Sequence, residues 1–291
     1  MTYRRLVVVP KPLDSVPRAA PVAPPGGVID PGWAPIGRRL AAARAEHLAT
    51  LDQLRAVLAE LAPAAEWVAE PSPESLAGAA LVITVGGDGT FLTAARHAGR
   101  TPLLGVNSSP TTSIGHYCLA TAETFASALG RALGHLDGDP AQAPTALSRI
   151  RAEIGDTVLP FEALNDVLFA NRSPVASTRY GLHIGDESTL QLSSGIWIAT
   201  ASGSTAAIRS AGGVVMQRSD PRLQWRVREP FVRAGCTLAL TEGLTDLPIE
   251  ILSRSDKNAL FLDGQSEPHI VPFGTRARLS RAPDPLFAFL P

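Results

Sequence analysis

Apolar segments follow one order before residue 147 and a different order after it. In the first part, short β-branched runs such as residues 6–9 and 81–85 alternate with stretches whose apolar residues recur at helical spacing, most clearly residues 38–61. This alternation predicts an open, mainly parallel sheet covered by helices. In the second part, short apolar runs are separated by turn residues alone, which predicts an antiparallel, sandwich-like β domain.

The chain of 291 residues is long enough for two domains. We place an α/β domain at residues 1–146 and a β-rich domain at residues 147–274. The terminal residues 275–291 end in an apolar run, and we expect them to pack back on the first domain. Residues 10–37 are dense in proline and glycine without a helical period, so we expect a long surface excursion there. Residues 206–210 follow a glycine-rich turn and are expected to begin a helix.

Composition and charge exclude several classes of protein. The chain is 45% hydrophobic and 18% charged, which allows a core and argues against disorder. Its net charge of −1 argues against nucleic acid as a main partner, because phosphate binding normally shows as a basic excess. No apolar run approaches the ~18 residues that span a bilayer, so we expect no membrane partner. The first strand directly follows "MTYRR", which leaves no room for a targeting segment and favours a cytoplasmic protein.

Three smaller features have ordinary explanations. Cys118 and Cys236 fit no zinc spacing and are expected to be buried free thiols in a reducing compartment. Trp197 and Trp225 are expected in the core or at a dimer contact. A local basic cluster fits a solvated strand face or, alternatively, a phosphate grip; its members are Arg222, Arg226, Arg228 and Arg233.

A glycine-rich turn, "GGDGT", follows the apolar run 81–85 and precedes residues 91–97, which read as a helix. Glycines at such a turn let backbone amides approach an anion closely, which makes the turn a ligand candidate. The turn matches neither the dinucleotide fingerprint nor a P-loop. A carboxylate among these amides suits phosphoryl transfer, with Asp88 as the base for an attacking hydroxyl and the amides of residues 86–90 as part of the anion site. The alternative is that Asp88 only caps the following helix.

Four motifs together resemble the NAD kinase family. "VGGDGTFLTAAR" is followed by "PLLGVNSSPTTSIGHYCLA", then by "LND" at 164–166, "IATASGSTAAIRSAGG", and "FLDGQ" at 261–265. They occur in the family's order over about residues 80–265. The resemblance implies the fold of NAD kinases and diacylglycerol kinases, with NAD bound between an α/β domain and a β domain. It also implies that a phosphate of ATP is transferred to the 2′-hydroxyl of the adenosine ribose of NAD, with Mg²⁺ or another divalent cation, by a homodimer or higher homo-oligomer.

Site residues follow from the resemblance, position by position. Asp88 resembles the catalytic base of the family. Asn165 and Asp166 resemble the pair that contacts the nicotinamide half of the substrate. The expected donor side comprises Gly86, Gly87, Gly89, Thr90, Asn107 and Lys11, the last of these because it follows the first strand and is placed to meet a phosphate. Further substrate contacts are expected at Ser204, Thr205, Ala206 and Asp263, of which the first three match the adenosine-recognition loop.

Three positions depart from the family's pattern. Asp166 stands where the commoner bacterial form has Glu, which shortens the reach of the carboxylate by about one methylene. Ser194 replaces a frequent acid, and Ala207 replaces a tyrosine that stacks on a base. With "GVNSSPTTSIGHYC", these departures resemble the mitochondrial type of NAD kinase more than the usual bacterial type, and they bear on how adenine and ribose are held.

Two histidines and two rival functions remain open at this stage. His116 follows a glycine and is expected to be a hydrogen-bonded structural residue. His47 lies on the apolar face of the helix at 38–61, where a structural role is again favoured over a site role. One rival function is a lipid or sphingoid-base kinase with the same turn, and the other is a non-catalytic NAD(P)-binding sensor. Neither the choice between ATP and polyphosphate nor that between NAD and NADH follows from the sequence.

Overall fold

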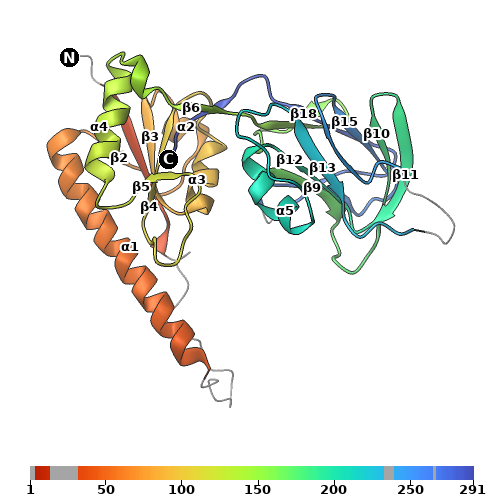
Figure 1. The fold of residues 1–291 in the computed structure, drawn as a ribbon, viewed down its shortest axis with the longest axis horizontal. Coiled ribbons are helices and arrows are strands. Elements are labelled where there is room, and N and C mark those ends of the chain that lie inside the picture. The colour runs from red at the N-terminus through yellow and green to blue at the C-terminus, as the bar shows by residue number, and fades with distance from the viewer. Residues whose placement is uncertain (1–3, 14–31, 233–238, 265–266) are drawn as a thin grey trace. The chain divides into compact units, whose positions relative to one another are not determined.

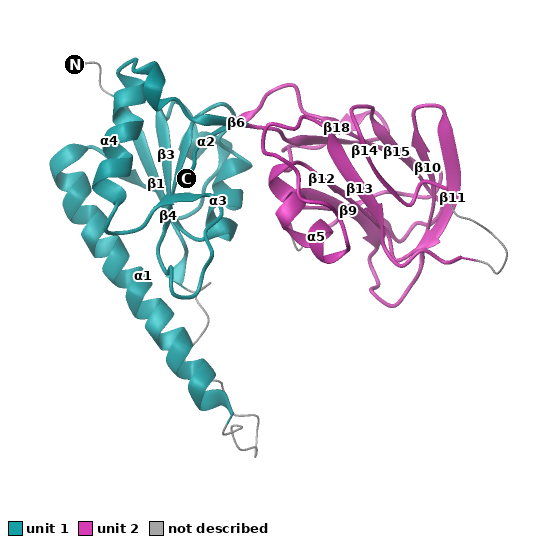
Figure 2. Ribbon diagram, viewed as in Figure 1, with its two compact units in different colours: residues 1–146, 287–291 teal, residues 147–286 magenta. Residues whose placement is uncertain are grey.

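The structure is a computed structural model that describes residues 4–13, 32–232, 239–264 and 267–291 (Figure 1). The chain divides into two compact units (Figure 2). Unit 1 comprises residues 1–146 and 287–291, and unit 2 comprises residues 147–286. Each unit has a hydrophobic core of its own.

Unit 1 is built on a seven-stranded sheet with the order β2-β1-β3-β4-β19-β6, in which β5 also pairs with β4. The pairs β1–β2, β1–β3, β3–β4, β4–β19 and β4–β5 are all parallel. The strands are β1 Leu6–Pro10, β2 Glu66–Trp67, β3 Leu81–Gly86, β4 Leu103–Asn107, β5 Cys118–Ala120, β6 Thr145–Leu147 and β19 Leu286–Phe289. Its central strands β1, β3 and β4 are continuous apolar runs, because a parallel sheet covered by helices is buried on both faces.

Helices cover both faces of this sheet. They are α1 Trp33–Leu61, α2 Pro73–Leu76, α3 Asp88–Ala95 and α4 Phe125–Leu136, with a short 3-10 turn, η2, at Pro140–Gln142. Figure 1 shows α1 and α4 on one side and α2 and α3 on the other. The first pair packs through a shared cluster that includes Leu54, Leu58, Phe125 and Leu129. This apolar stripe on α1 is the one that the spacing of leucines predicted.

Unit 2 consists of two antiparallel sheets that enclose its core. One has the order β11-β10-β15-β18-β7-β8, and the other the order β14-β13-β12-β9-β16-β17. The first is formed by β7 Ile150–Ile154, β8 Thr157–Val158, β10 Thr178–Ile184, β11 Glu187–Ser193, β15 Ile249–Ser253 and β18 Arg276–Arg281. The second is formed by β9 Asp166–Asn171, β12 Ile196–Ala199, β13 Leu223–Val227, β14 Glu242–Thr245, β16 Asn258–Leu262 and β17 His269–Ile270. A 3-10 turn, η3 Ser202–Thr205, leads into the short helix α5 Ala207–Ser210.

The predicted fold class is confirmed, with a mainly parallel α/β part and an antiparallel sandwich. Several boundaries differ from the expectation. Helix α1 begins at Trp33 rather than Arg38, so the end of the proline-rich stretch is helical, while residues 14–31 lie outside the described part. Helix α3 begins at Asp88, three residues earlier than expected. Residues 276–281, which we expected on the first domain, form β18 of unit 2; only residues 287–291 belong to unit 1.

The smaller features have ordinary structural roles. Trp225 is buried in the core of unit 2. Cys118 is a buried free thiol, and burial together with the nearby charge of Asp88 raises its pKa to about 12. In the basic cluster, Arg222 pairs with Asp220, Arg226 pairs with Glu242, and Arg228 lies over the ring of Trp197, which favours the strand-face explanation. Cys236 and Arg233 fall outside the described residues.

Candidate active site

A cavity of about 630 Å³ lies in unit 1 where strands β1, β3 and β4 end. Its volume is within the usual range of small-molecule sites. The carboxyl ends of parallel strands are also where open α/β sheets bind ligands. Four segments line the cavity: Lys11 after β1; Ile36, Arg39, Leu40, Ala43 and His47 of α1; the turn from Gly86 to Thr90; and Asn107, Ser108, Ser109, Thr112 and Ser113 after β4.

The first two glycines of the turn are required by close approach. A Cβ on Gly86 would lie 2.7 Å from the Cβ of Thr90, and one on Gly87 would lie 2.6 Å from Oγ of Ser113. A Cβ on Gly89, by contrast, would have no atom within 4 Å. The turn is therefore compact on its inner side and open at Gly89.

Asp88 is the first residue of α3 and lines the cavity. Its Oδ1 accepts a hydrogen bond from the backbone N–H of Tyr117 at 2.9 Å. The ring of Tyr117 stacks on Phe91, with centroids 4.9 Å apart. Oδ2 has no hydrogen bond within the described residues. No side chain caps α3, so the capping alternative for Asp88 is wrong. One carboxylate oxygen is thus fixed by the scaffold, and the other is left for a ligand.

Asn107 shapes the loop that follows β4. Its Nδ2 donates to the carbonyl of Ser113 at 3.0 Å, and its Oδ1 accepts from the N–H of Ser109 at 3.2 Å. Gly115, with φ of +67°, packs against the same side chain, since a Cβ there would lie 2.6 Å from Nδ2. We expected Asn107 on the donor side; it lines the cavity but uses its amide to close a loop of hydroxyl-bearing residues.

Helix α1 holds this loop through three polar side chains. Nδ1 of His47 hydrogen-bonds with Oγ of Ser108 at 2.7 Å, and Oγ1 of Thr50 donates to the Ser108 carbonyl at 3.2 Å. Oε2 of Glu46 accepts from Oγ of Ser109 at 2.7 Å and from Oγ1 of Thr111 at 2.6 Å. Glu46 and Thr50 were missed by sequence reasoning. The available signal was a buried polar pair, His47 and Thr50, three residues apart within an apolar stripe.

The His47 imidazole is buried and favours its neutral form. Burial has the largest effect and lowers its pKa; a backbone hydrogen bond with Lys11 opposes this shift, and the positive charges of Lys11 and Arg44 lower the pKa further. His47 therefore belongs to the cavity wall, a role that sequence reasoning did not favour. His116 is exposed and makes no hydrogen bond within the described residues, so the expectation of a hydrogen-bonded structural residue was wrong.

The cavity carries the donors and positive charge that an anion requires. Lys11 and Arg39 line it, and neither pairs with a carboxylate in the described part of the chain. Amides of the glycine turn and the hydroxyls of the loop lie on the same cavity. Among the described lining residues, one carboxylate stands beside these donors, that of Asp88. This combination suits a polyphosphate with a hydroxyl beside it.

In unit 2, Asp263 organises the segment from Leu164 to Asp166. Its carboxylate accepts hydrogen bonds from the N–H groups of Leu164 at 2.8 Å, Asn165 at 2.7 Å and Asp166 at 3.3 Å. Asp263 has φ of 47°, a left-handed backbone that aspartate tolerates better than most residues. From the sequence we expected Asp263 to contact substrate. In the structure its carboxylate accepts the backbone hydrogen bonds of this segment.

The second glycine-rich loop meets this segment. Oγ1 of Thr200 donates to the carbonyl of Leu164 at 2.6 Å, and a Cβ on Gly203 would lie 2.7 Å from Cα of Asn165. Ser204 is fully buried; its hydroxyl donates to Ala201 O at 2.7 Å and accepts from Met216 N at 2.9 Å, so it has no hydrogen left to donate to a substrate. The exposed Thr205 and half-buried Ala206 remain accessible.

Asp166 is a buried carboxyl with an unusual proton affinity. Burial raises its pKa to about 7, and the negative charge of Asp263 adds to the effect. A group with such a pKa changes its charge near neutral pH. The pair Asn165 and Asp166 therefore places an amide beside a carboxyl whose pKa is held well above its ordinary range by burial.

Known proteins are similar to this chain in sequence. Residues 38–135 match the family described as the ATP-NAD kinase N-terminal domain. Over 235 residues the chain is 35% identical to a "Probable NADH kinase" of Oryza sativa subsp. japonica, a match that covers 72% of this chain and 71% of that protein. The chain belongs to the NAD kinase family.

Two solved structures of the family share the fold. The yeast NADH kinase complexed with NADH superimposes with a TM-score of 0.72 at 16% identity, covering 99% of this chain and 84% of that chain. An NAD kinase from Archaeoglobus fulgidus in complex with ATP gives a TM-score of 0.68 at 21% identity, with coverage of 98% and 93%. The assignment made from the motifs is confirmed, and the match to the rice NADH kinase agrees with the expected likeness to the mitochondrial type.

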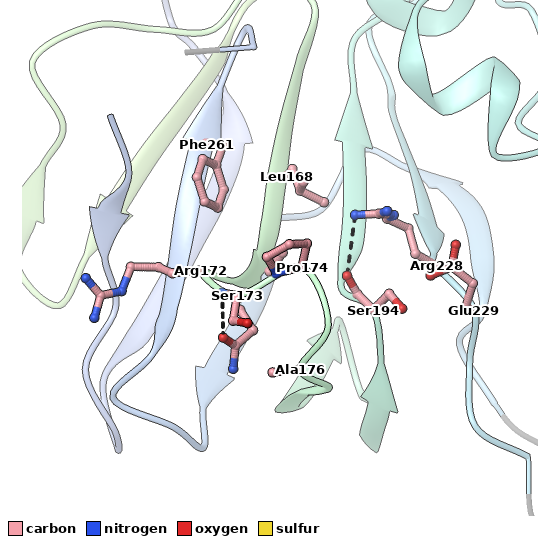
Figure 3. Close-up of a pocket in the computed structure, with 11 residues that line it drawn as sticks. Leu168, Arg172, Ser173, Pro174, Ala176, Ser194, Arg228, Glu229 and Phe261 are labelled. Atoms are coloured by element: carbon pink, nitrogen blue, oxygen red, sulfur yellow. Dashed lines mark hydrogen bonds between the residues drawn. The ribbon is translucent and has the colours of Figure 1, made fainter. Parts of the chain in front are cut away.

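The departure from the family's pattern at Ser194 lies away from the Asn165–Asp166 pair. A cavity of about 240 Å³ in unit 2 contains Ser194 together with Arg228, whose Nη1 donates to Ser194 O at 3.5 Å (Figure 3). Strand β12 runs from this cavity, and its far end at Ala199 pairs with Asp166. Ser194 is therefore separated by the length of β12 from the residues that we expected to contact substrate.

No helix among the described residues has both the length and the apolar character needed to cross a membrane. Those residues also contain no group of three or more His, Cys, Asp or Glu side chains arranged to hold a metal ion. At the unit 1 cavity, Asp88 is the lining carboxylate that would be available to a divalent cation. One protein carboxylate is compatible with Mg²⁺, which commonly binds through one or two carboxylates plus substrate phosphates.

Proposed function

We propose that this protein is a phosphotransferase that moves the terminal phosphate of ATP to the 2′-hydroxyl of the adenosine ribose of NAD or NADH. The observation that carries the proposal is the carboxylate of Asp88, which is oriented by the Tyr117 amide and whose second oxygen faces a donor-lined cavity with no hydrogen bond to any described residue. Membership of the NAD kinase family supports it. The name of the rice relative supports acceptance of NADH as well as NAD.

The phosphates of the donor bind at the glycine turn. Backbone amides from Gly87 to Gly89, the Lys11 ammonium and the Arg39 guanidinium supply hydrogen bonds and positive charge, whereas the Thr90 amide already donates to the Gly87 carbonyl. A bound Mg²⁺, held by phosphate oxygens and within reach of Asp88, would neutralise charge on the transferred group. The loop held by Glu46 and His47 fixes the remaining hydroxyl wall.

Asp88 acts on the acceptor. Its Oδ2 accepts the hydrogen bond of the ribose 2′-hydroxyl and takes the proton as the bond between that oxygen and the terminal phosphorus forms. The bond from this phosphorus to the bridging oxygen of ADP breaks, and ADP leaves with that electron pair. Because Oδ1 is tied to the Tyr117 amide, the carboxylate reacts without first having to be oriented.

Unit 2 supplies the dinucleotide-recognition residues. We assign Asn165 and Asp166 to the nicotinamide half, and Thr205 with Ala206 to the adenosine half. Asp263 and Ser204 act through the backbone, since their polar atoms are engaged in holding the two loops. A homodimer or higher homo-oligomer remains part of the proposal, and light scattering on the purified chain measures it.

A product assay tests the proposed function. The purified chain is incubated with NAD or NADH, ATP and Mg²⁺, and phosphorylated dinucleotide is quantified; a parallel reaction offers a sphingoid base or diacylglycerol. We expect NADP or NADPH and no lipid phosphate. Binding of NAD without NADP would select the sensor, and lipid phosphate without NADP would select the lipid kinase.

A further inference from the structure

The cavity in unit 1 has an apolar wall that phosphate chemistry does not use. Ile36, Leu40 and Ala43 line it from helix α1. Their spacing of four and three residues puts them on one face of the helix. The other lining side chains are polar or charged, and the glycines of the turn add only backbone. The apolar side chains are thus gathered on one wall.

This wall is not covered by the core of unit 1. Ile36 is 49% exposed, whereas Leu51, Leu54 and Leu58 further along α1 are buried against the sheet. Figure 1 shows the N-terminal part of α1 extending past the sheet. An apolar stripe that faces a polar cavity and lacks a partner among the described residues is suited to an apolar part of a ligand.

The position of the wall relative to the anion site constrains the form of a ligand that contacts both. Ile36 lies eleven residues before His47, which is about 16 Å along a helix. His47 holds the hydroxyl loop at the phosphate end. A molecule that fills both ends has a flat apolar group at one end and a chain of phosphates at the other. A nucleoside triphosphate has this form, whereas an inorganic polyphosphate does not.

We propose that Ile36 and Leu40 are specificity-determining residues that form a subsite for the nucleoside of the phosphate donor. The inference rests on the proposed function. It adds the residues that let the site discriminate between a nucleoside triphosphate and inorganic polyphosphate as the phosphate donor. The base packs on the stripe while the phosphates lie at the glycine turn. Because Ile36, Leu40 and Ala43 carry no side-chain hydrogen-bonding group, this wall contributes affinity for a nucleoside without reading the edge of its base.

Donor kinetics of the full chain test the subsite. The variants are Ile36→Ala, Leu40→Ala and the double variant, in which alanine preserves the helix. Leu48→Ala is the matched control, since Leu48 is an exposed leucine of the same helix that does not line the cavity. NADP formation is measured against ATP and against tripolyphosphate, and equilibrium binding of a non-hydrolysable ATP analogue and of tripolyphosphate is measured in parallel.

The double variant is expected to raise the KM for ATP and the Kd for the analogue about fivefold to tenfold, the change that follows from losing some 50 Å² of apolar contact. The kcat of the double variant and its affinity for tripolyphosphate stay within twofold of the values of the original chain. Leu48→Ala changes neither KM nor Kd for either donor. An unchanged KM and Kd for the nucleotide would overturn the subsite, as would an equal loss for tripolyphosphate. If the original chain makes no NADP from any donor, the proposed function fails, while analogue binding still decides the subsite.

Discussion

Gly86 and Gly89 belong to the same five-residue turn, yet the structure constrains them differently. A side chain at Gly86 meets Thr90 and cannot be placed without moving α3, whereas one at Gly89 points into open space on a helix. The sequence motif alone does not show which of its glycines the fold requires. The geometry separates a glycine required for folding from one required, if at all, by a ligand.

We expect Gly86→Ala to destabilise the protein by about 1–3 kcal/mol, the usual cost of forcing an atom into packed surroundings. Gly89→Ala should leave stability unchanged or raise it by up to about 1 kcal/mol, because alanine is the better helix former. Urea unfolding of both variants checks this. Equal destabilisation by the two substitutions would contradict the geometry of the turn.

Asp166 gives stability a pH dependence. Its pKa is about 7 in the folded chain and about 4 when unfolded, so the folded state binds the extra proton between these values. Stability from this group is therefore greatest near pH 4 and falls as the pH rises to 7. His47, whose pKa is lowered, acts in the opposite direction and loses stability as the pH falls below about 6.5.

Comparison with Asp166→Asn isolates the carboxyl from His47. We expect the free energy of unfolding of the variant, relative to the original chain, to increase between pH 4 and pH 8 by an amount on the order of 3–4 kcal/mol. Chemical denaturation at pH 4, 6 and 8 measures the difference. A difference that does not change with pH would show that Asp166 titrates normally.

At the scale of single residues, the sequence was informative where chemistry is local. Asp88 and its glycines are adjacent in the chain, so the turn could be recognised as a site. Glu46 and His47 could not be assigned in the same way, because their partners Ser109 and Ser108 lie about sixty residues away. The internal hydrogen bonds of Ser204 and Asp263 could not be predicted for a related reason, since a motif does not show which of its polar atoms are used within the fold.

At the scale of elements, α1 is both a core helix and a support for the site. Its second half packs on the sheet, and its middle holds the loop after β4 through Glu46, His47 and Thr50. Removing the Glu46 carboxylate leaves the hydroxyls of Ser109 and Thr111 without the acceptor that they share. The loop then depends on its remaining contacts, among them those with His47, Thr50 and Asn107.

We expect Glu46→Ala to lower stability by about 1.5–3 kcal/mol, the usual range for hydrogen bonds to a charged group, and to raise the KM for the phosphate donor. Glu60→Ala is the control, because Glu60 is an exposed glutamate on the same helix with no hydrogen bond to the described residues. Thermal unfolding and donor titration of both variants decide the point. If Glu46→Ala and Glu60→Ala had the same stability and the same KM for the donor, Glu46 would have no role in holding the loop.

Long periodic elements could be predicted from the sequence and short ones could not. Strands β1, β3 and β4 and helices α1 and α4 have enough residues to show a period. Strands β5 and β6 have three residues each, too few for any pattern. The first turn of α1 follows a proline-rich stretch and itself contains Pro35, which hid the start of the helix.

At the scale of the whole molecule, unit 2 is inserted into unit 1. The chain leaves the first sheet after β6 and returns to it as β19, which pairs with β4. Within unit 2 the two ends meet, because Ile150 pairs with Arg281 in the same sheet. The change of sequence pattern near residue 147 predicted where the chain passes from unit 1 to unit 2. The terminal apolar run was expected to return to the first domain, but its partner strand could not be predicted, because an apolar run of four residues does not reveal which strand it pairs with.

This arrangement predicts that residues 147–286 fold when expressed alone. They contain a complete core between two sheets, and their ends are already adjacent. We expect a β-rich circular dichroism spectrum and a cooperative urea transition. A chain without cooperative unfolding would show that unit 2 depends on unit 1 for its stability.

The most direct test of the account is the Asp88→Asn variant, assayed for both turnover and binding. Asparagine keeps an oxygen that accepts from the Tyr117 amide, so the fold and the cavity are retained while the base is lost. With NAD, ATP and Mg²⁺, the account predicts a fall in kcat of about 10²–10⁴-fold and a Kd for NAD within about threefold of the original chain. A variant that forms NADP at a rate close to that of the original chain would contradict the central claim.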